Sequence, residues 1–197
     1  MAQLYAIVGN IERARFMLES EVPYLQLRFK EQSLDSYRDE IAGWRLQFPQ
    51  THVIVNDDLD FALANKVWGV HLGQEDADRY PPERLRELAK TRGPVLGIST
   101  HDDAELARAK SVGAAMVGFG PLFATTTKEL KRTPHGIAPL ARAVREFGLP
   151  VVAIGGIGED TLGAVADTGV AMIAMVAYLD RLTSKTQVDV LQRRIAR

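Results

Sequence analysis

The sequence predicts an α/β protein, a single compact (β/α)8 barrel of the TIM-barrel type, and two observations support this. Short apolar runs alternate with amphipathic helical stretches from one end of the 197-residue chain to the other. Most of these runs are nearly continuous in apolar residues, as strands covered on both faces of a parallel sheet require. Strict alternation of strands and helices favours a closed barrel over an open sheet, although about 250 residues is typical of the fold.

The expected strands are short and evenly distributed. They are Leu4–Val8, Tyr24–Leu27, His52–Val55, Gly69–Leu72, Val95–Ile98, Met116–Phe119, Val151–Ile154 and Met172–Val176. Between and after them, amphipathic spacing predicts helices. These are Ile11–Glu19, Leu34–Gln47, Leu59–Asn65, Pro82–Arg92, Asp102–Val112, Pro139–Phe147, Asp160–Thr168 and Val188–Ala196.

Start and stop residues support several of these helices. Ser33 precedes the second, Thr100 precedes the fifth and Pro81 precedes the fourth, while Gly113 and Gly148 stand where helices should end. No linker, low-complexity segment or block of charge interrupts the pattern. We therefore expect residues 1–197 to form one domain.

Composition excludes several classes of function. The chain has no cysteine, which removes disulfides, thiol nucleophiles and cysteine metal sites, and its net charge of −1 suggests no nucleic-acid partner. The N-terminal segment MAQLYAIVGN lacks the features of a signal peptide, and no apolar run approaches the ~20 residues that span a bilayer. We expect a soluble, cytoplasmic protein without a membrane partner.

In a barrel of this kind, functional residues follow the carboxyl ends of the strands. The second strand ends in LQLRFK, where alternation places Gln26, Arg28 and Lys30 on the inner face and the apolar residues between them on the outer face. Two cations side by side repel each other unless an anion joins them. The trio is either an anion site or a solvated strand end.

Acidic segments follow the next two strands. VIVNDDLD contains Asn56 and Asp57, with Asp60 placed to cap a helix, and VHLGQED contains Asp76. Neighbouring parallel strands lie ~4.8 Å apart, so Asp57 and Asp76 could share one Mg2+, which takes one or two protein carboxylates and completes its shell with water and phosphate oxygens. The alternative for each cluster alone is helix capping and solubility.

The remaining strand ends offer hydrogen-bond donors. GISTH contains Ser99, and GFGPLFATTTKE contains Thr125, Thr127 and Lys128, which suit phosphate oxygens unless the segment is merely an exposed loop. VVAIGGIG contains Gly156, which lets a ligand approach the backbone.

The backbone amides of Val176 and Ala177, after the eighth strand, are of the same kind. Two anion sites follow, one with the basic residues and the Asp57–Asp76 cation, the other with the glycine and these amides. Such an arrangement suits two phosphorylated substrates.

Taken together and in order, QLRFK, VNDDLDFAL, GVHLGQED, GISTH, VGFGPLFATTTK and VVAIGGI resemble the motifs of the thiamine phosphate synthase family, over roughly Leu4 to Leu179. The resemblance implies an enzyme, a transferase with Mg2+ as cofactor. It condenses 4-amino-2-methyl-5-(hydroxymethyl)pyrimidine diphosphate with 4-methyl-5-(2-phosphoethyl)thiazole, giving thiamine phosphate and pyrophosphate.

The resemblance also implies a role for each site residue. The diphosphate would contact Gln26, Arg28, Lys30, Asn56 and Lys128. Mg2+ would be held by Asp57 and Asp76, and Ser99 would lie near the pyrimidine. The thiazole phosphate would be received by Thr125, Thr127, Gly156, Val176 and Ala177. The residues acting in catalysis would be Arg28, Lys30, Ser99 and Lys128.

Some positions depart from the family pattern. Ala177 stands where the family commonly has a serine, and Met172 replaces a glycine and is expected to fill core. Two rival functions stay open: a thiazole tautomerase of the same fold, in which a histidine stands at the place of Pro121, and a non-catalytic homologue that binds thiamine phosphates. The residues do not determine the oligomeric state, and a homodimer stays open.

Overall fold

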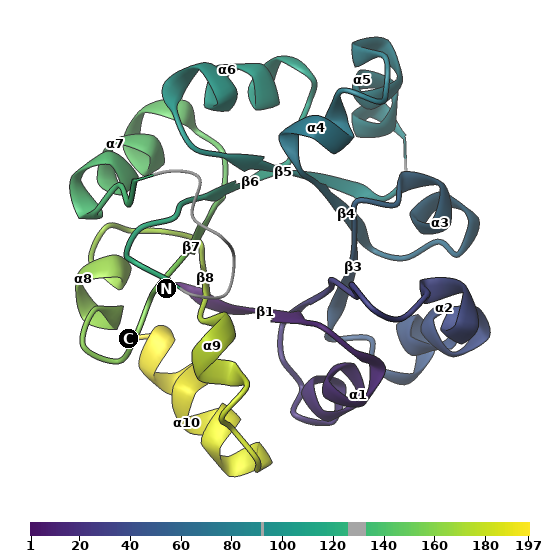
Figure 1. Ribbon diagram of the computed structural model, residues 1–197, viewed down its shortest axis with the longest axis horizontal. Coiled ribbons are helices and arrows are strands. Elements are labelled where there is room, and N and C mark those ends of the chain that lie inside the picture. Colours follow the sequence, from purple (N-terminus) through teal and green to yellow (C-terminus); the bar gives the residue numbers. More distant parts are fainter. Residues whose placement is uncertain (92, 126–132) are drawn as a thin grey trace.

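The structure is a computed structural model that describes residues 1–91, 93–125 and 133–197. Eight parallel strands close into one barrel in the order β1 to β8, with helices around the outside (Figure 1). The strands are β1 (Gln3–Val8), β2 (Tyr24–Leu27), β3 (His52–Asn56), β4 (Gly69–Leu72), β5 (Val95–Thr100), β6 (Met116–Phe119), β7 (Val151–Ile154) and β8 (Met172–Ala174). The predicted (β/α)8 barrel is confirmed.

The barrel closes between its first and last strands, where Gln3 pairs with Met172. The clearest differences from the predicted strands lie at carboxyl ends. β5 continues to Thr100, whose hydroxyl donates to the Gly118 carbonyl oxygen of β6 at 2.9 Å. β8 ends at Ala174, because Val176 begins a short helix instead of ending the strand.

The helices lie where amphipathic spacing predicts them, with two additions. They are α1 (Ile11–Glu19), the 3-10 turn η1 (Leu34–Tyr37), α2 (Arg38–Gln47), α3 (Leu59–Ala64), α4 (Gln74–Ala77), α5 (Pro82–Lys90), α6 (Asp103–Ser111), α7 (Ile137–Phe147), α8 (Leu162–Ala166), α9 (Val176–Leu179) and α10 (Lys185–Ile195). The sequence did not predict α4 and α9, which have four residues each and follow β4 and β8.

The helix caps agree only in part with the prediction. Ser33 caps η1 as expected, its hydroxyl accepting from the Asp35 amide. Asp58, rather than Asp60, caps α3, and Asp102, rather than Thr100, caps α6. In both corrected cases an aspartate that precedes the helix reaches its third amide, which is the usual geometry of an N-cap.

The core has two layers. The larger one lies between the barrel and its helices, and contains Leu25 and Leu27 of β2. The smaller one fills the inside of the barrel with Tyr5, Ile7, Ile54, Met116, Val152, Met172 and Ala174. Met172 therefore fills core, as expected. A filled interior leaves the ends of the barrel as the places for ligands.

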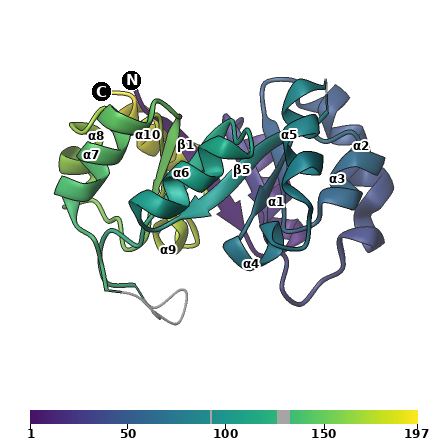
Figure 2. The same cartoon turned by 90° about the horizontal axis from the view of Figure 1, so that it is seen from above.

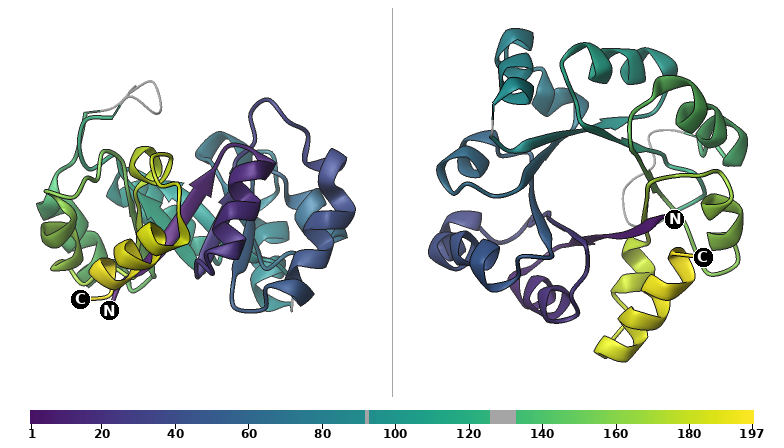
Figure 3. Two further views of the ribbon diagram at one scale, coloured as in Figure 1. Left: turned by 90° about the horizontal axis from the view of Figure 1, so that it is seen from below. Right: turned by 180° about the vertical axis from the view of Figure 1, so that it is seen from behind.

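The two ends of the barrel differ. α4 and α9, which follow the carboxyl ends of β4 and β8, lie at one end, and both chain termini lie at the other (Figure 2). Two further views show the termini side by side at that second end (Figure 3). The residues predicted to act on ligands follow carboxyl ends of strands, so they belong to the end that holds α4 and α9.

Candidate functional site

Gln26 and Asn56 begin a chain of hydrogen bonds across β2 and β3. The Gln26 side chain is only 3% exposed, and its Nε2 donates to Asn56 Oδ1 at 2.6 Å. Register explains this contact: Gln26 pairs with Ile54, so Asn56 lies two residues further along the same face of β3. Asn56 Nδ2 donates in turn to Asp57 Oδ2. The inward position expected for Gln26 is therefore observed.

Asp57 adopts a strained backbone conformation directly after β3. Its φ is +63°, in the left-handed region that few residues other than glycine adopt, with Asp and Asn the usual exceptions. Its N–H donates to the His71 carbonyl oxygen at 2.8 Å, and its Oδ1 accepts from the Gly73 N–H at 3.1 Å. These contacts with β4 and the loop after it direct the carboxylate toward the next strand end.

Asp76, in the first turn of α4, lies close enough to Asp57 to raise the pKa of that carboxyl. Arg79 Nη1 lies 3.2 Å from Asp76 Oδ1 on the exposed side. A Cβ at Gly73 would lie 2.9 Å from Asp76 Oδ2 and 3.9 Å from Asp57 Oδ1. The glycine therefore leaves the room in which the two carboxyl groups meet, and the predicted convergence of Asp57 and Asp76 is a feature of the structure.

The pKa of Asp57 is raised, chiefly because the carboxyl is partly buried; the Gly73 N–H opposes this, and the Asp76 charge adds to it. Two carboxylates in contact repel each other unless a proton or a cation lies between them. Mg2+ commonly binds such a pair and takes its other ligands from water and phosphate oxygens. No group of three or more His, Cys, Asp or Glu side chains could hold a metal in the described part of the chain. The pair thus fits an ion that also depends on its substrate for ligands.

Arg28 and Lys30 lie on a loop rather than on the strand predicted for them. Pairing of β2 with β3 ends at Leu27 opposite Val55, and beyond it the Arg28 N–H donates to the Val8 carbonyl oxygen of β1 at 2.9 Å. Arg28 is half-buried and close enough to Asp57 to lower the pKa of that carboxyl, whereas Lys30 is exposed. Arg28 therefore lies near Asp57, as its expected inward position requires. Lys30 faces solvent instead of the inner face predicted for it.

Ser99 of β5 contacts a buried histidine that the sequence did not single out. His71 Nε2 lies 3.0 Å from Ser99 Oγ, and His71 is 7% exposed. Burial lowers the His71 pKa to about 4, so the ring is neutral at pH 7. Its Nδ1 has no hydrogen-bond partner among the described residues. A buried lone pair is tolerated better than a buried N–H, which favours the tautomer in which Nε2–H donates to Ser99. The Ser99 hydrogen is then available to a ligand.

Neighbouring glycines make room for the His71 ring. A Cβ at Gly97 of β5 would lie 2.7 Å from His71 Nδ1, and one at Gly118 of β6 would lie 3.2 Å from His71 Cε1. The start of α4 approaches the same place, since Gln74 Nε2 donates to the Ser99 carbonyl oxygen at 2.5 Å. Ser99 is thus held on both its hydroxyl and its backbone.

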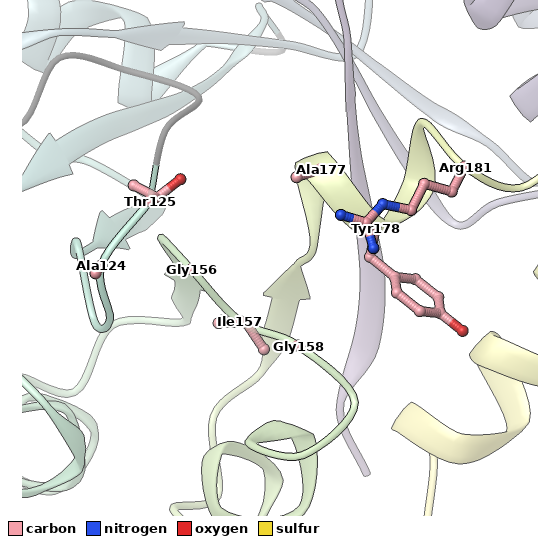
Figure 4. A pocket seen from close by; sticks show the side chains of 8 residues that line it. All are labelled: Ala124, Thr125, Gly156, Ile157, Gly158, Ala177, Tyr178 and Arg181. Atoms are coloured by element: carbon pink, nitrogen blue, oxygen red, sulfur yellow. The ribbon is translucent and has the colours of Figure 1, made fainter.

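A cavity of about 360 Å3 lies among the loops that follow β6, β7 and β8 (Figure 4). It is lined by Ala124, Thr125, Gly156, Ile157, Gly158, Ala177, Tyr178 and Arg181. Thr125, Gly156 and Ala177 were predicted to bind one anion, and the structure brings them together here. Val176 is not among the lining side chains, because as the first residue of α9 it packs against the cluster inside the barrel.

Gly155 and Gly156 shape the backbone beside this cavity. Their φ angles are +99° and +66°, and a Cβ on Gly156 would lie 2.4 Å from the Ala124 carbonyl oxygen. The glycine at 156 is thus required by the close approach of the loop after β6. The fold therefore needs this glycine even without a ligand. The sequence had indicated another reason, that a glycine lets a ligand approach the backbone.

Two residues that line the cavity with polar side chains, Tyr178 and Arg181, were missed. Tyr178 donates its hydroxyl to Glu159 Oε1, and Arg194 of α10 donates to Glu159 Oε2 at 2.8 Å, so α9 is tied to the loop after β7 and to the last helix. Arg181 follows α9 within one turn. Extending the search two helical turns beyond the eighth strand would have found both.

Two predicted site residues, Thr127 and Lys128, lie outside the described residues. In the part of the chain that the structure does describe, no helix is long and apolar enough to cross a membrane.

Comparison with known proteins finds one family over most of the chain. Residues 4–179 match the family model described as thiamine monophosphate synthase. The thiamine-phosphate synthase of Cronobacter sakazakii is 37% identical over 179 residues, covering 89% of this chain and 83% of that protein. The thiamine-phosphate synthase of Pelotomaculum thermopropionicum is 38% identical over 173 residues, covering 87% and 78%.

Solved structures show the same fold. The thiamine phosphate pyrophosphorylase of Pyrococcus furiosus superposes with a TM-score of 0.81 at 28% identity, covering 98% of this chain and 95% of that one. A 3-hexulose-6-phosphate synthase superposes with a TM-score of 0.67 at 14% identity over 98% of this chain and 99% of that one, which supports the barrel fold alone.

Proposed function

We propose, from the premise that the chain belongs to the thiamine monophosphate synthase family, that it makes thiamine phosphate. Family membership confirms the resemblance seen in the motifs and the prediction of an enzyme of the transferase type. The proposed substrates are 4-amino-2-methyl-5-(hydroxymethyl)pyrimidine diphosphate and 4-methyl-5-(2-phosphoethyl)thiazole. One observation above all supports two phosphorylated substrates: a carboxylate pair and a separate glycine-bordered cavity both follow carboxyl ends of strands.

The diphosphate belongs beside Asp57. Arg28 lies close enough to lower the pKa of that carboxyl, and Lys30 and Lys128 would add further positive charge to the diphosphate site. Gln26 and Asn56, already hydrogen-bonded to each other, contribute amide donors. As the carbon–oxygen bond to the pyrimidine methylene breaks, its electron pair leaves with pyrophosphate. Cationic side chains stabilise this charge where it develops, which is the largest contribution that fixed groups usually make.

Asp57 and Asp76 would hold Mg2+, which when bound neutralises charge on the diphosphate oxygens. The facing carboxyl groups and the raised pKa of Asp57 support this assignment, since the pair needs a positive partner.

The pyrimidine belongs near Ser99. With Nε2–H of His71 donating to its oxygen, the Ser99 hydroxyl is oriented as a donor to a ring nitrogen. The electron-rich aminopyrimidine stabilises the methylene cation, so the leaving group departs before the nucleophile arrives. The thiazole nitrogen then forms the new carbon–nitrogen bond with its lone pair, and no general base is needed.

The thiazole phosphate belongs in the cavity lined by Thr125, Gly156 and Ala177, with Thr127 and the Val176 amide as further donors. Binding there holds the thiazole in place, and a positioned reaction replaces a bimolecular encounter.

One observation favours a second candidate, a protein that binds thiamine phosphate without turnover. Ala177 provides no hydroxyl in the cavity, so its contribution to ligand binding is limited to the backbone. Reduced affinity for the thiazole phosphate would weaken synthesis more than it weakens binding of the joined product, which has contacts in both sites.

Pyrophosphate release, measured after both substrates and Mg2+ are mixed with the protein, tests the proposal. We expect turnover that needs both substrates, stops with a chelator and falls at least 100-fold in Lys128→Ala, because a cation on the leaving group is lost. Lys90→Ala, an exposed substitution in α5, is the matched control and should not change turnover. Product binding without turnover would support the carrier, and isomerisation of the thiazole alone would support a tautomerase.

A further inference from the structure

Arg181 is the one charged residue among those that line the cavity in the described part of the chain. Its side chain is exposed, and neither an ion pair nor a hydrogen bond engages its guanidinium among the described residues. Arg13, by contrast, donates to the carbonyl oxygens of Leu179 and Leu182 at 2.7 and 3.0 Å. One of the two arginines at the end of α9 is thus used by the fold, and the other is left to the cavity.

The direction of the side chain supports a role in the cavity. In Figure 4 the Arg181 guanidinium extends back along α9 toward the space bordered by Ala177 and Gly156. The Tyr178 hydroxyl points the other way, to Glu159. Glu159 is itself occupied by Tyr178 and by Arg194, so it does not neutralise Arg181.

Ala177 explains why a cation at position 181 matters in this chain. Ala177 borders the cavity without a polar atom on its side chain. Arg181 lies four residues later in a chain that keeps turning, since its N–H donates to the Tyr178 carbonyl oxygen at 3.1 Å. Ala177 and Arg181 both line the cavity, so the guanidinium reaches the space beside Ala177.

We propose that Arg181 binds the phosphate monoester of the thiazole substrate and replaces the side-chain donor that Ala177 lacks. A guanidinium presents several N–H donors in a planar fork, which matches phosphate oxygens and forms charge-assisted hydrogen bonds. The identity of the ligand rests on the proposed function. The consequence is selectivity: the chain distinguishes the phosphorylated thiazole from the corresponding alcohol through Arg181.

The test compares Arg181→Gln with the original protein on two thiazole substrates, the phosphate and its unphosphorylated alcohol. We expect KM for the phosphate to rise about 10- to 100-fold, as is typical when a hydrogen bond to a charged group is lost. KM for the pyrimidine diphosphate and both kinetic constants for the alcohol should stay unchanged. Equal losses on both thiazoles, or no loss on the phosphate, would overturn the proposal.

Matched variants make the result specific. Arg193→Gln removes an exposed arginine of α10 outside the cavity and should leave every constant unchanged. Adding Ala177→Ser to Arg181→Gln should recover part of the lost affinity, because a hydroxyl returns beside the phosphate. If Arg193→Gln weakens the thiazole phosphate as much as Arg181→Gln, general charge explains the effect and the proposal is wrong.

Direct binding separates this proposal from the proposed function. Calorimetry measures inorganic phosphate and the thiazole phosphate without the pyrimidine substrate, so turnover is not needed. If the protein proves to have no synthase activity, weaker binding of these anions to Arg181→Gln than to the original chain would still support the assignment of Arg181. Equal binding of these anions to the original chain and to Arg181→Gln would overturn the assignment of Arg181. The absence of any binding to the original chain would overturn it as well.

Discussion

Two sides of the same barrel end are built from different groups. The first side follows β2 to β5, and the second side follows β6 to β8. On the first side, polar side chains contact one another: Gln26, Asn56 and Asp57 form a hydrogen-bonded chain, and Asp57 meets Asp76. On the second side, the backbone beside Gly156 borders an open cavity. The carboxyl groups of the first arrangement repel each other when both are charged, whereas the described lining of the second has one charged group, the Arg181 guanidinium. Ligand binding should therefore change stability more on the first side.

The largest expected effect is that of Asp76→Asn. Activity should fall about 10²- to 10³-fold, because the proposed Mg2+ site loses one of its two carboxylates. The Mg2+ charge that would stabilise the departing diphosphate is then no longer held in place. The Tm without Mg2+ should nevertheless rise, since an amide donates to the Asp57 carboxylate where a second carboxylate repelled it. A gain of about 1 kcal/mol corresponds to ~2–4 °C in a chain of this size.

Glu75→Gln, which removes an exposed charge from the same helix, is the control for Asp76→Asn. It should change neither activity nor Tm by much. Mg2+ should raise the Tm of the original protein and of Glu75→Gln, but not that of Asp76→Asn. A Tm of Asp76→Asn below that of the original protein in the absence of Mg2+ would contradict the idea of a repelling pair.

A second effect on the same side is a pH-dependent stability that originates in His71. Its pKa is about 4 in the folded protein and ~6.5 when unfolded, so between these values the unfolded chain binds the proton more tightly. The free energy of unfolding should be unaffected by this group above pH 6.5, fall as the pH is lowered from 6.5 to 4, and level off below. The fall amounts to about 3 kcal/mol in all.

Urea denaturation at several pH values measures this effect. Carboxyl groups also titrate in the range, so the informative quantity is the difference between the original protein and His71→Leu. Between pH 6.5 and 4, the slope of the free energy of unfolding against pH should be smaller in the variant, by up to the contribution of one bound proton. Parallel curves for the two proteins would show that His71 is not the buried neutral group described above.

The smallest expected effect concerns the backbone on the second side. Gly156→Ala should destabilise the protein by about 1–3 kcal/mol, because φ is +66° and the new Cβ would lie 2.4 Å from the Ala124 carbonyl oxygen. KM for the thiazole phosphate should rise as the cavity is distorted. Gly163→Ala in α8, where the space around the Cβ is open, should instead stabilise by up to ~1 kcal/mol. Equal effects of the two substitutions would show that the close approach of Gly156 to the Ala124 carbonyl oxygen does not constrain the cavity.

The strands were predictable because each is buried on both faces and therefore nearly continuous in apolar residues. β6 and β7 were found at their observed bounds, Met116–Phe119 and Val151–Ile154. α4 and α9 were not predicted, since a four-residue helix is too short to show the spacing of an amphipathic helix. They matter nonetheless, because α4 contains Asp76 and α9 borders the cavity.

The two sides of the site also differed in how well the sequence predicted them. Asp57 and Asp76 were found because carboxylates after neighbouring strands are conspicuous by residue type. His71 was missed although its inward position follows from alternation with Val70 and Leu72 on β4, because a single histidine among apolar residues gives no indication of its partner. Arg181 was missed because it follows a helix that the sequence did not predict.

By itself, the sequence determined which residues form strands, the closed order of those strands and the family to which the chain belongs, because burial and motif order are local properties of the chain. Only the tertiary structure decided which side chains meet. The proximity of Asp57 to Asp76, the bond between His71 and Ser99, and the position of Arg181 beside Ala177 all depend on register and loop geometry. The reason is physical: polar contacts change within an ångström or two, whereas apolar patterning tolerates such shifts.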